Sequence, residues 1–382
     1  MPLPRLHRHA WMDDDVEAFR DQVRRYVAGE IAPRMDAWRR AGEMPRDAWH
    51  KLGSMGFLLP EMPEAYGGAG VSAAWQLVVQ DELTRAEVPP GGGVHSLAAH
   101  YVLDYGSEEQ KRRWLPKMVS GEHFGAIGMT EPGGGSDLKA LRTRARRDGD
   151  HYVIDGAKTF ITNGATCSLL VLACRTGGEG AKGVSLIVLE TEDLPGFSVG
   201  RRLEKLGMHA SDTCELAFEG VRVPVANLLG ATEGEGFAQM MSQLPYERLF
   251  IGVPAAAVIE RALEVTLEYT RERKAFGQPL AEFQNTRFKL AEVATIAHVV
   301  RSFVNDAIQR FVDGTLDNEA AYMVKWWCSE QQCKVVDECL QLFGGYGYMT
   351  EYPIARMYAD SRAQRIYGGS NEVMKDLIAR KL

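Results

Sequence analysis

The spacing of hydrophobic residues changes twice along the chain and divides it into three regions. From Met12 to His123, apolar residues recur every three or four positions, which gives an α-helix one apolar face. Asp13 can cap the first helix, whose stripe comprises Val16, Phe19, Val23, Val27 and Ile31. Because glycine and proline interrupt the later helical stretches, we predict several helices. We therefore assign residues 1–123 to an N-terminal α-helical domain.

The apolar spacing shortens to two in the next region, from Phe124 to Gly230. Alternation of this kind places one side of each segment in a core, as in a half-buried β-strand. The strand candidates are Tyr152 with Ile154, residues 169–172 and 184–189, and Cys214 with Leu216 and Phe218. The Asp155-Gly156 pair predicts a tight hairpin turn. Residues 124–231 are therefore predicted to form a β domain.

Helical spacing returns near Gly234 and continues to the end of the chain. One long stripe suits packing within a helix bundle, and it runs over Leu290, Val293, Ala297, Val300, Val304, Ile308 and Phe311. A second long helix is predicted over residues 318–343 and a last one from about Glu372. The predicted fold is mainly α with a central β domain, and its C-terminal helical domain covers 232–382. Strands and helices do not alternate as a doubly wound fold requires.

Composition narrows the possible classes of protein. The 382 residues carry a net charge of −7 with interspersed signs, and no basic stripe indicates nucleic-acid binding. No run of 18 apolar residues predicts a membrane span. The six cysteines lack C-x-x-C or zinc spacing, so we predict neither a metal site nor a disulfide. The first residues resemble neither a secretory signal nor a transit peptide, which predicts a cytoplasmic protein.

Five segments carry residues suited to binding, although each has a purely structural alternative. Gly128–Asp137 (GMTEPGGGSD) lets backbone amides approach a ligand, or forms a surface loop. Residues 158–164 (KTFITNG) predict a strand that ends in a turn. Residues 270–284 collect positive charge that suits a phosphate or a helix dipole. Residues 341–353 (QLFGGYGYMTEYP) predict a helix C-cap, and Ser370 predicts an N-cap at a helix end that suits an anion.

Together, the order and spacing of these segments resemble the acyl-CoA dehydrogenases over essentially the whole chain. TEPGGGSD and RKAFG are specific to that superfamily, and IYGGSNEVMKDLIAR resembles its long-chain branch. The resemblance implies a helical domain, a β-barrel-like middle domain and a C-terminal four-helix bundle, with FAD between the last two. It also implies a homotetramer that oxidises a fatty acyl-CoA and passes electrons to an electron-transferring flavoprotein.

The resemblance implies FAD contacts in all of these segments. Thr130 is expected at the pyrimidine side of the flavin, Phe160 beside the ring and Thr162 near flavin N5. Arg273, Phe276 and Gln284 are expected to reach the cofactor from a partner subunit. The full set of implied contacts is Ile127, Met129, Thr130, Gly135, Ser136, Phe160, Ile161, Thr162, Arg273, Phe276, Gln284, Gln341, Leu342, Phe343, Gly344, Gly345, Ser370, Asn371 and Glu372.

The catalytic base departs from the pattern of many family members. They carry a glutamate in a Tyr-Glu-Gly sequence, where this chain has Tyr367-Gly368-Gly369. Long-chain and isovaleryl-type members instead place the base in a Glu-Arg pair that starts a helix, which matches Glu247-Arg248. A glutamate in a first helical turn is otherwise a common partner of the helix dipole. Because Gly368 cannot take a proton, we assign Glu247 as the base.

The implied reaction is α,β-desaturation of an acyl thioester to the trans-2-enoyl-CoA. Glu247 takes the α-proton and flavin N5 takes the β-hydride. The thioester carbonyl accepts hydrogen bonds from the Gly368 amide and the FAD ribityl hydroxyl, as in an oxyanion hole. The implied substrate contacts are Ser136, Tyr246, Glu247, Arg248, Tyr367, Gly368 and Gly369.

Two other functions stay open at this point. One is a flavin-dependent oxidase or monooxygenase of the same superfamily, which rapid oxygen consumption by the reduced enzyme would reveal. The other is a non-catalytic homologue that acts as an assembly partner, which colourless purified protein would support. The sequence also leaves open the acyl chain length and a carrier-protein thioester in place of CoA.

Overall fold

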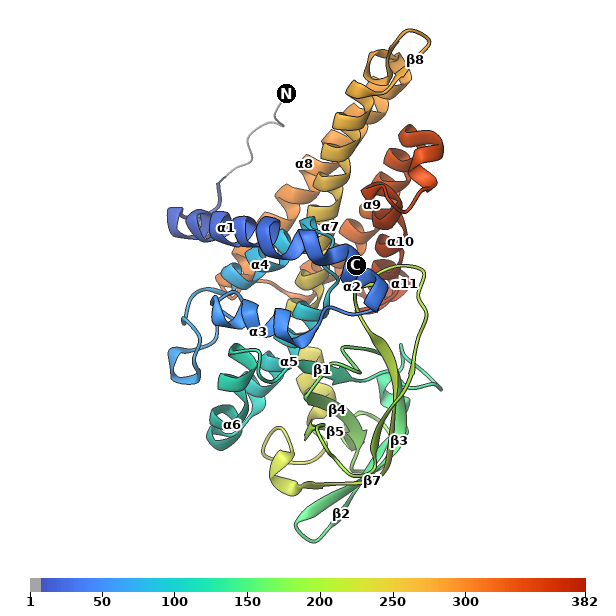
Figure 1. Cartoon of the computed structure of the whole chain (residues 1–382). Helices are drawn as coiled ribbons and strands as arrows, with labels where there is room; N and C mark the ends of the chain where they lie inside the picture. The colour runs from blue at the N-terminus through green and yellow to red at the C-terminus, as the bar shows by residue number, and fades with distance from the viewer. Residues whose placement is uncertain (1–7) are drawn as a thin grey trace.

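The computed structural model describes residues 8–382, and three regions follow one another as the hydrophobic spacing predicts (Figure 1). The helices of the first region are α1 (Asp14–Tyr26), α2 (Met35–Ala41), α3 (Arg46–Ser54), α4 (Ala73–Arg85), α5 (Gly91–Tyr105) and α6 (Glu108–Val119). Asp13 caps α1, because its side chain accepts a hydrogen bond from the Val16 amide at 2.8 Å. The predicted stripe from Val16 to Ile31 is buried, and α1 packs against α4.

The middle region is a twisted sheet below the helices (Figure 1). Its strands are β1 (Gly125–Gly128), β2 (Arg144–Asp148), β3 (His151–Thr162), β4 (Leu169–Arg175), β5 (Val184–Glu190), β6 (Phe197–Arg202) and β7 (Thr213–Pro224). They are ordered β1-β4-β2-β3-β7-β6, and β5 pairs with β4. Strands β4 and β5 are buried on both faces, which explains their continuous apolar sequences.

The predicted hairpin turn at Asp155-Gly156 is wrong. Both residues lie inside β3, where the register with β7 shifts between Ile154 and Gly156. Gly156 has a φ of +149°, and a side chain there would crowd Thr143 at 2.7 Å. A bulge therefore uses the glycine that the sequence suggests for a turn. The chain reverses at 149–150 instead, between β2 and β3.

The C-terminal region is built on three long helices, α7 (Gly236–Glu272), α8 (Gln284–Val312) and α9 (Asn318–Phe343). The short helices α10 (Pro353–Ser361) and α11 (Asn371–Ala379) pack on α9. A small hairpin, β8 (Lys274–Ala275) and β9 (Gln278–Pro279), joins α7 to α8 at an end that projects from the body (Figure 1). The resulting order of helical, β and helical domains confirms the predicted fold class.

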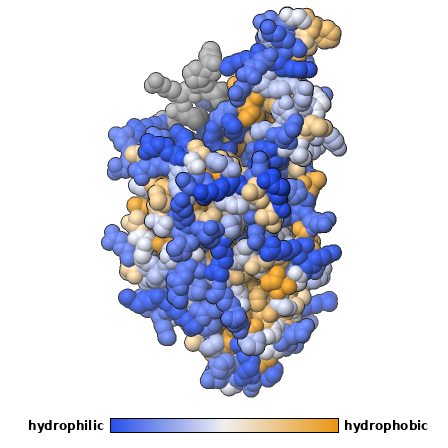
Figure 2. Space-filling model, viewed as in Figure 1, coloured by the Kyte–Doolittle hydropathy of each residue, from blue (hydrophilic) through white to orange (hydrophobic). Residues whose placement is uncertain are grey.

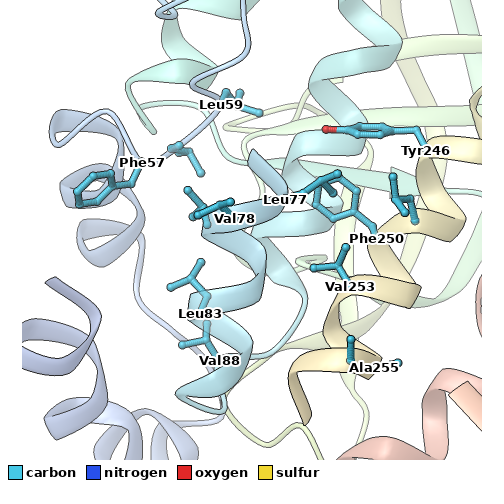
Figure 3. Packing of buried hydrophobic residues seen from close by; sticks show 14 of the residues in the cluster. Phe57, Leu59, Leu77, Val78, Leu83, Val88, Tyr246, Phe250, Val253 and Ala255 are labelled. Atoms are coloured by element: carbon cyan, nitrogen blue, oxygen red, sulfur yellow. The ribbon is translucent and has the colours of Figure 1, made fainter. Parts of the chain in front are cut away.

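A shared core joins the first and third regions. Leu77 on α4 faces Phe250 and Val253 on α7, and all three are at least 90 per cent buried (Figure 3). Removing each such side chain from water stabilises the fold by about 1.5–3 kcal/mol. The N-terminal helices therefore fix the position of α7. This position matters because α7 carries the predicted base, Glu247.

The surface view shows mostly hydrophilic residues with apolar groups between them (Figure 2). No helix within residues 8–382 is long and apolar enough to cross a membrane. The largest exposed apolar side chain near the projecting hairpin is Phe276, which is 97% exposed. This end of the molecule thus presents an aromatic ring that none of residues 8–382 covers.

Candidate active site

Glu247 lies inside α7 and not at its start. The helix begins at Gly236, about three turns earlier. The helix dipole acts within the first turn only, so the dipole explanation of this glutamate is wrong, and so is its expected place at a helix start. A partly buried carboxylate in the middle of a helix needs another reason, and its surroundings supply one.

The Glu247 carboxylate is held in a partly buried position by one hydrogen bond. The Tyr101 hydroxyl on α5 donates to Glu247 Oε1 at 2.8 Å. Burial raises the pKa of Glu247, and this effect outweighs the opposing influence of the Tyr101 hydrogen bond and the Arg248 charge. A carboxylate with a raised pKa is a stronger base once ionised, as proton abstraction requires.

The turn of Tyr367, Gly368 and Gly369 packs against the same part of α7. Gly368 and Gly369 have φ values of +64° and +83°. A side chain at Gly368 would overlap Ile251, which lies one helical turn after Glu247 on the same face. The structure therefore packs the Gly368 turn against α7 one helical turn from Glu247. Ile251 occupies the space that a glutamate side chain at position 368 would need.

Arg248 is buried beside this site without an acidic partner for hydrogen bonding. Its side chain is stacked over the Tyr322 ring at 4.3 Å, and the residue is 3% exposed. Its Nε and Nη1 atoms have no hydrogen-bond partner among the described residues. Burial lowers the pKa of Arg248. Free donors on a buried guanidinium suit a ligand acceptor, so the predicted substrate role of Arg248 has support and stays a prediction.

Tyr246 points away from this face of α7. It stacks on Phe311 at 5.0 Å and lies near His100, and its hydroxyl faces Ser96 at 3.2 Å and Glu61 at 3.4 Å. These contacts place the ring in the protein core. Its predicted substrate contact stays a prediction that these neighbours do not support.

A second acid, Asp360 on α10, lies beside the same turn. With Tyr367 it lines a narrow cavity whose α7 wall is Pro254, Val258 and Arg261. Burial raises the pKa of Asp360 to about 6. The Met208 amide donates to Asp360 Oδ1, so this carboxylate already has a backbone partner. The sequence gives no sign of this acid, because it becomes buried only when α10 meets the loop before β7.

The predicted flavin contacts of the middle domain come together where the loop after β1 meets the end of β3. The Thr159 amide donates to the Thr130 carbonyl at 2.9 Å, which ties the glycine-rich loop to β3. The buried Lys158 ammonium donates to the Met129 carbonyl at 3.1 Å and to Glu131 at 2.8 Å. Phe160 follows with a φ of +58° and is 67% exposed. A loop held rigidly beside an exposed aromatic ring fits a planar cofactor.

A second group of predicted FAD contacts lies at a separate hollow near the projecting hairpin. It has a volume of about 560 Å³ and is lined by Arg273 and by residues 341–345. Open space surrounds Gly344 and Gly345, so a ligand can approach their backbone. Phe276 and Gln284 are exposed beside it. Figure 1 shows this end far from the sheet, so one chain presents the FAD contacts as two separate groups.

The last group of predicted contacts begins α11. Ser370 caps the helix by accepting a hydrogen bond from the Val373 amide at 3.3 Å, and Glu372 is exposed. Asn371 differs, because it is 1% exposed and its side chain bonds to residues of α9. Its predicted contact with FAD therefore stays a prediction, and its side chain bonds to Lys325, Ser329 and Glu330.

Comparisons with known proteins identify the family of the chain. Three family models match in order: the acyl-CoA dehydrogenase N-terminal domain over residues 13–122, its middle domain over 126–221 and its C-terminal domain over 234–382. The chain is 43% identical to the long-chain specific acyl-CoA dehydrogenase, mitochondrial, of Sus scrofa, over 96% of this chain and 86% of that protein.

Solved structures show the same likeness. An acyl-CoA dehydrogenase from Geobacillus kaustophilus matches with a TM-score of 0.95 and 43% identity, covering 98% of this chain and 99% of that one. A glutaryl-CoA dehydrogenase from Mycobacterium smegmatis in complex with FADH2 matches with a TM-score of 0.90 and 28% identity, covering 97% and 95%. The chain therefore belongs to the acyl-CoA dehydrogenase family and is an FAD-dependent acyl-CoA dehydrogenase.

Proposed function

We propose that this enzyme desaturates a fatty acyl-CoA between its α and β carbons with Glu247 as the base. The observation that carries the proposal is the packing of the Gly368 turn on α7 next to Glu247. The proposal assigns the carboxylate to the α-proton and the Gly368 backbone amide to the thioester oxygen. The bound FAD supplies the redox chemistry by accepting the β-hydride at N5.

The residues of this chain reduce the cost of removing a weakly acidic α-proton. The Gly368 amide binds the thioester oxygen and stabilises the negative charge that grows there, worth roughly 2.7–4 kcal/mol per donor. Bound substrate also expels water from Glu247, which adds to the burial that already raises its pKa. Tyr101 holds the carboxylate in one orientation, so no rearrangement is needed when the proton moves.

FAD would be held by Thr130, Phe160 and Thr162 of one subunit and by the hollow at Arg273 of a partner subunit. The separation of these two groups in a single chain supports this arrangement, as does the exposed ring of Phe276. We therefore propose a homotetramer in which each FAD site is completed by a neighbouring chain. An electron-transferring flavoprotein is the proposed electron acceptor, and a cytoplasmic location stays a prediction.

The decisive experiment is the Glu247→Gln variant. It should bind FAD normally but reduce the flavin with acyl-CoA at least about 10²-fold more slowly, because general-base catalysis contributes about 10²–10⁴-fold. The measurement is anaerobic bleaching of the flavin absorbance after mixing with substrate. Wild-type bleaching in this variant would remove Glu247 as the base.

The matched control is Asp360→Asn, which neutralises the second acid beside the same turn. We expect the rate of flavin bleaching to stay within about threefold of wild type, because Asp360 already faces the Met208 amide.

A series of acyl-CoAs of increasing length, with one carrier-protein thioester, would identify the substrate. Oxygen consumption by the reduced enzyme would separate a dehydrogenase from the oxidase alternative.

A further inference from the structure

A buried polar stripe runs along one face of α9. Lys325, Ser329 and Gln332 are spaced four and three residues apart, so they lie on the same side of the helix. Each is at most 1% exposed. Polar groups in such positions cost free energy unless they have partners, so a stripe of three calls for an explanation.

Two residues of the stripe converge on Asn371. Lys325 Nζ donates to Asn371 Oδ1 at 2.9 Å, and Ser329 Oγ donates to the same oxygen at 3.1 Å. Asn371 Nδ2 donates to Glu330 Oε2 at 3.1 Å, and Arg365 pairs with that carboxylate at 3.0 Å. Within residues 8–382 Lys325 forms no ion pair with a carboxylate, and burial lowers its pKa to about 8. The Asn371 oxygen is thus held by two donors and its nitrogen by one acceptor.

The third residue of the stripe holds the other end of the same segment. Gln332 Nε2 donates to Ser361 Oγ at 2.8 Å, and Cys333 Sγ donates to the Ser361 carbonyl at 3.4 Å. Residues 361–371 therefore span two anchoring points on α9. Between them lies the Gly368-Gly369 turn with its two positive φ values. Consecutive glycines are the most flexible backbone available, so the turn depends on its anchors for a fixed position.

We propose that the Lys325–Ser329–Asn371 clamp is a positioning device that fixes the Gly368 amide opposite Glu247. This inference rests on the proposed function, because it assigns the Gly368 amide to the thioester oxygen. The clamp does not touch the reacting atoms. It acts by holding the first turn of α11, which follows the glycine pair directly, while Ile251 of α7 limits the turn from the other side. Displacement of a catalytic group by about 1 Å is enough to cost about 10²-fold in rate.

The test is the Asn371→Ala holoenzyme. We expect kcat to fall roughly 10- to 100-fold while KM changes less than about threefold, because the amide matters most when charge develops on the oxygen. The second measurement is the fraction of bound 3-oxoacyl-CoA present as its enolate at neutral pH, read from ligand absorbance. This fraction should fall in the variant. FAD content, measured from the visible spectrum and by equilibrium dialysis, should stay at the wild-type value.

Two further variants keep the proposal testable if Asn371→Ala folds poorly. Ser329→Ala removes one of two donors to the Asn371 oxygen and should give a smaller loss of the same kind. Glu330→Gln keeps an oxygen acceptor for Asn371 Nδ2 but loses the ion pair with Arg365, and should also give a smaller loss than Asn371→Ala. Asn227→Ala is the matched control, because Asn227 is a buried amide in the middle domain whose side chain donates to the Val188 carbonyl. It should lower stability without changing the enolate fraction.

The possible outcomes separate the clamp from the proposed function. An unchanged enolate fraction in both Asn371→Ala and Ser329→Ala overturns the clamp. The proposed function is still supported in that case if acyl-CoA bleaches the flavin of the wild-type enzyme. Loss of FAD affinity with an unchanged enolate fraction also overturns it, and assigns Asn371 to the cofactor instead. Wild-type protein that neither bleaches with any acyl-CoA nor ionises the 3-oxo ligand overturns the proposed function itself.

Discussion

Two buried groups of charges in this molecule behave in opposite ways. Between the N-terminal helices and the bundle, Arg20 pairs with Asp81 at 2.7 Å, and Arg301 pairs with Asp81 at 2.9 Å and with Glu260 at 2.7 Å. Burial alone would raise the pKa of Asp81, but Arg301 and Arg20 outweigh it and lower the pKa to about 2. Every charge in this group has an opposite charge within reach.

The charges beside the candidate base are not matched in this way. Glu247 has a tyrosine hydroxyl as its partner, and neither Arg248 nor Lys325 forms an ion pair among the described residues. Burial raises the pKa of Glu247, whereas the pKa of the more fully buried Asp81 is lowered by Arg301 and Arg20. A difference in partners, and not in burial, therefore sets the direction of the shift.

The contrast separates a structural role from a catalytic one. Matched charges join helices and stabilise the ionised form of each carboxylate. The lowered pKa makes such a carboxylate a weak base, which does not suit proton abstraction. Unmatched polar groups cost stability and are retained where a ligand completes them. The following predictions test this difference from the largest expected effect to the smallest.

Asp81→Asn should be the most destabilising of these changes. It leaves Arg20 and Arg301 buried with one acidic partner fewer, and removing one member of a buried ion pair costs about 3–5 kcal/mol. Because the pKa of Asp81 is lowered on folding, its contribution is complete at neutral pH and is lost as the pH falls from about 4 towards about 2. Urea unfolding of the holoenzyme at neutral and acid pH measures both effects.

The structural assignment of the Asp81 group would be reversed by a different result. In that result, the Asp81→Asn variant keeps its free energy of unfolding but its bound flavin is reduced more slowly by acyl-CoA. The network would then belong to the catalytic apparatus. We expect the reverse: the folded fraction of the variant should reduce its flavin with acyl-CoA at the wild-type rate, because the Asp81 carboxylate accepts hydrogen bonds only from Arg20 and Arg301 among the described residues.

Much of the fold follows from periodicity alone. The stripe predicted from Leu290 onwards lies in α8, and the helix predicted over 318–343 matches α9. Local patterns succeed here because helical burial has one period and leaves one apolar face. The hairpin at Asp155-Gly156 fails because a glycine at a bulge and a glycine in a turn look the same in sequence.

The site divides in the same way. Motifs locate Glu247 and Gly368, but the contacts that give them their properties come from distant parts of the chain. Tyr101 lies 146 residues before Glu247, and Lys325 lies 46 residues before Asn371. No local pattern distinguishes a tyrosine that reaches the candidate base from one that fills the core. Tyr101 is of the first kind, and Tyr246, which stacks on Phe311, is of the second. Such pairings appear only when helices are packed.

Tyr101→Phe should produce an intermediate effect that sharpens the contrast. The Tyr101 hydroxyl favours the ionised form of Glu247, so its loss should raise the pKa of the base further. A hydrogen bond to a charged group is worth about 1.5–3 kcal/mol, so the rate should fall about tenfold at low pH and less at high pH. The measurement is the pH profile of flavin bleaching. A uniform loss at all pH values would instead indicate misplacement of the carboxylate.

Asp360→Asn should have the smallest effect, and its sign distinguishes the two kinds of acid. The folded pKa of Asp360 is raised to about 6, so the folded state binds a proton more tightly than the unfolded chain. Wild-type stability relative to the variant is therefore lost as the pH rises from about 4 to about 6. The asparagine oxygen can still accept from the Met208 amide. At neutral pH the variant should be more stable by about 1 kcal/mol, and this gain should vanish below about pH 4. Unfolding across this pH range measures it. A variant that is less stable at neutral pH would show that the ionised Asp360 has a partner like those of Asp81, and the contrast would then hold for Glu247 alone.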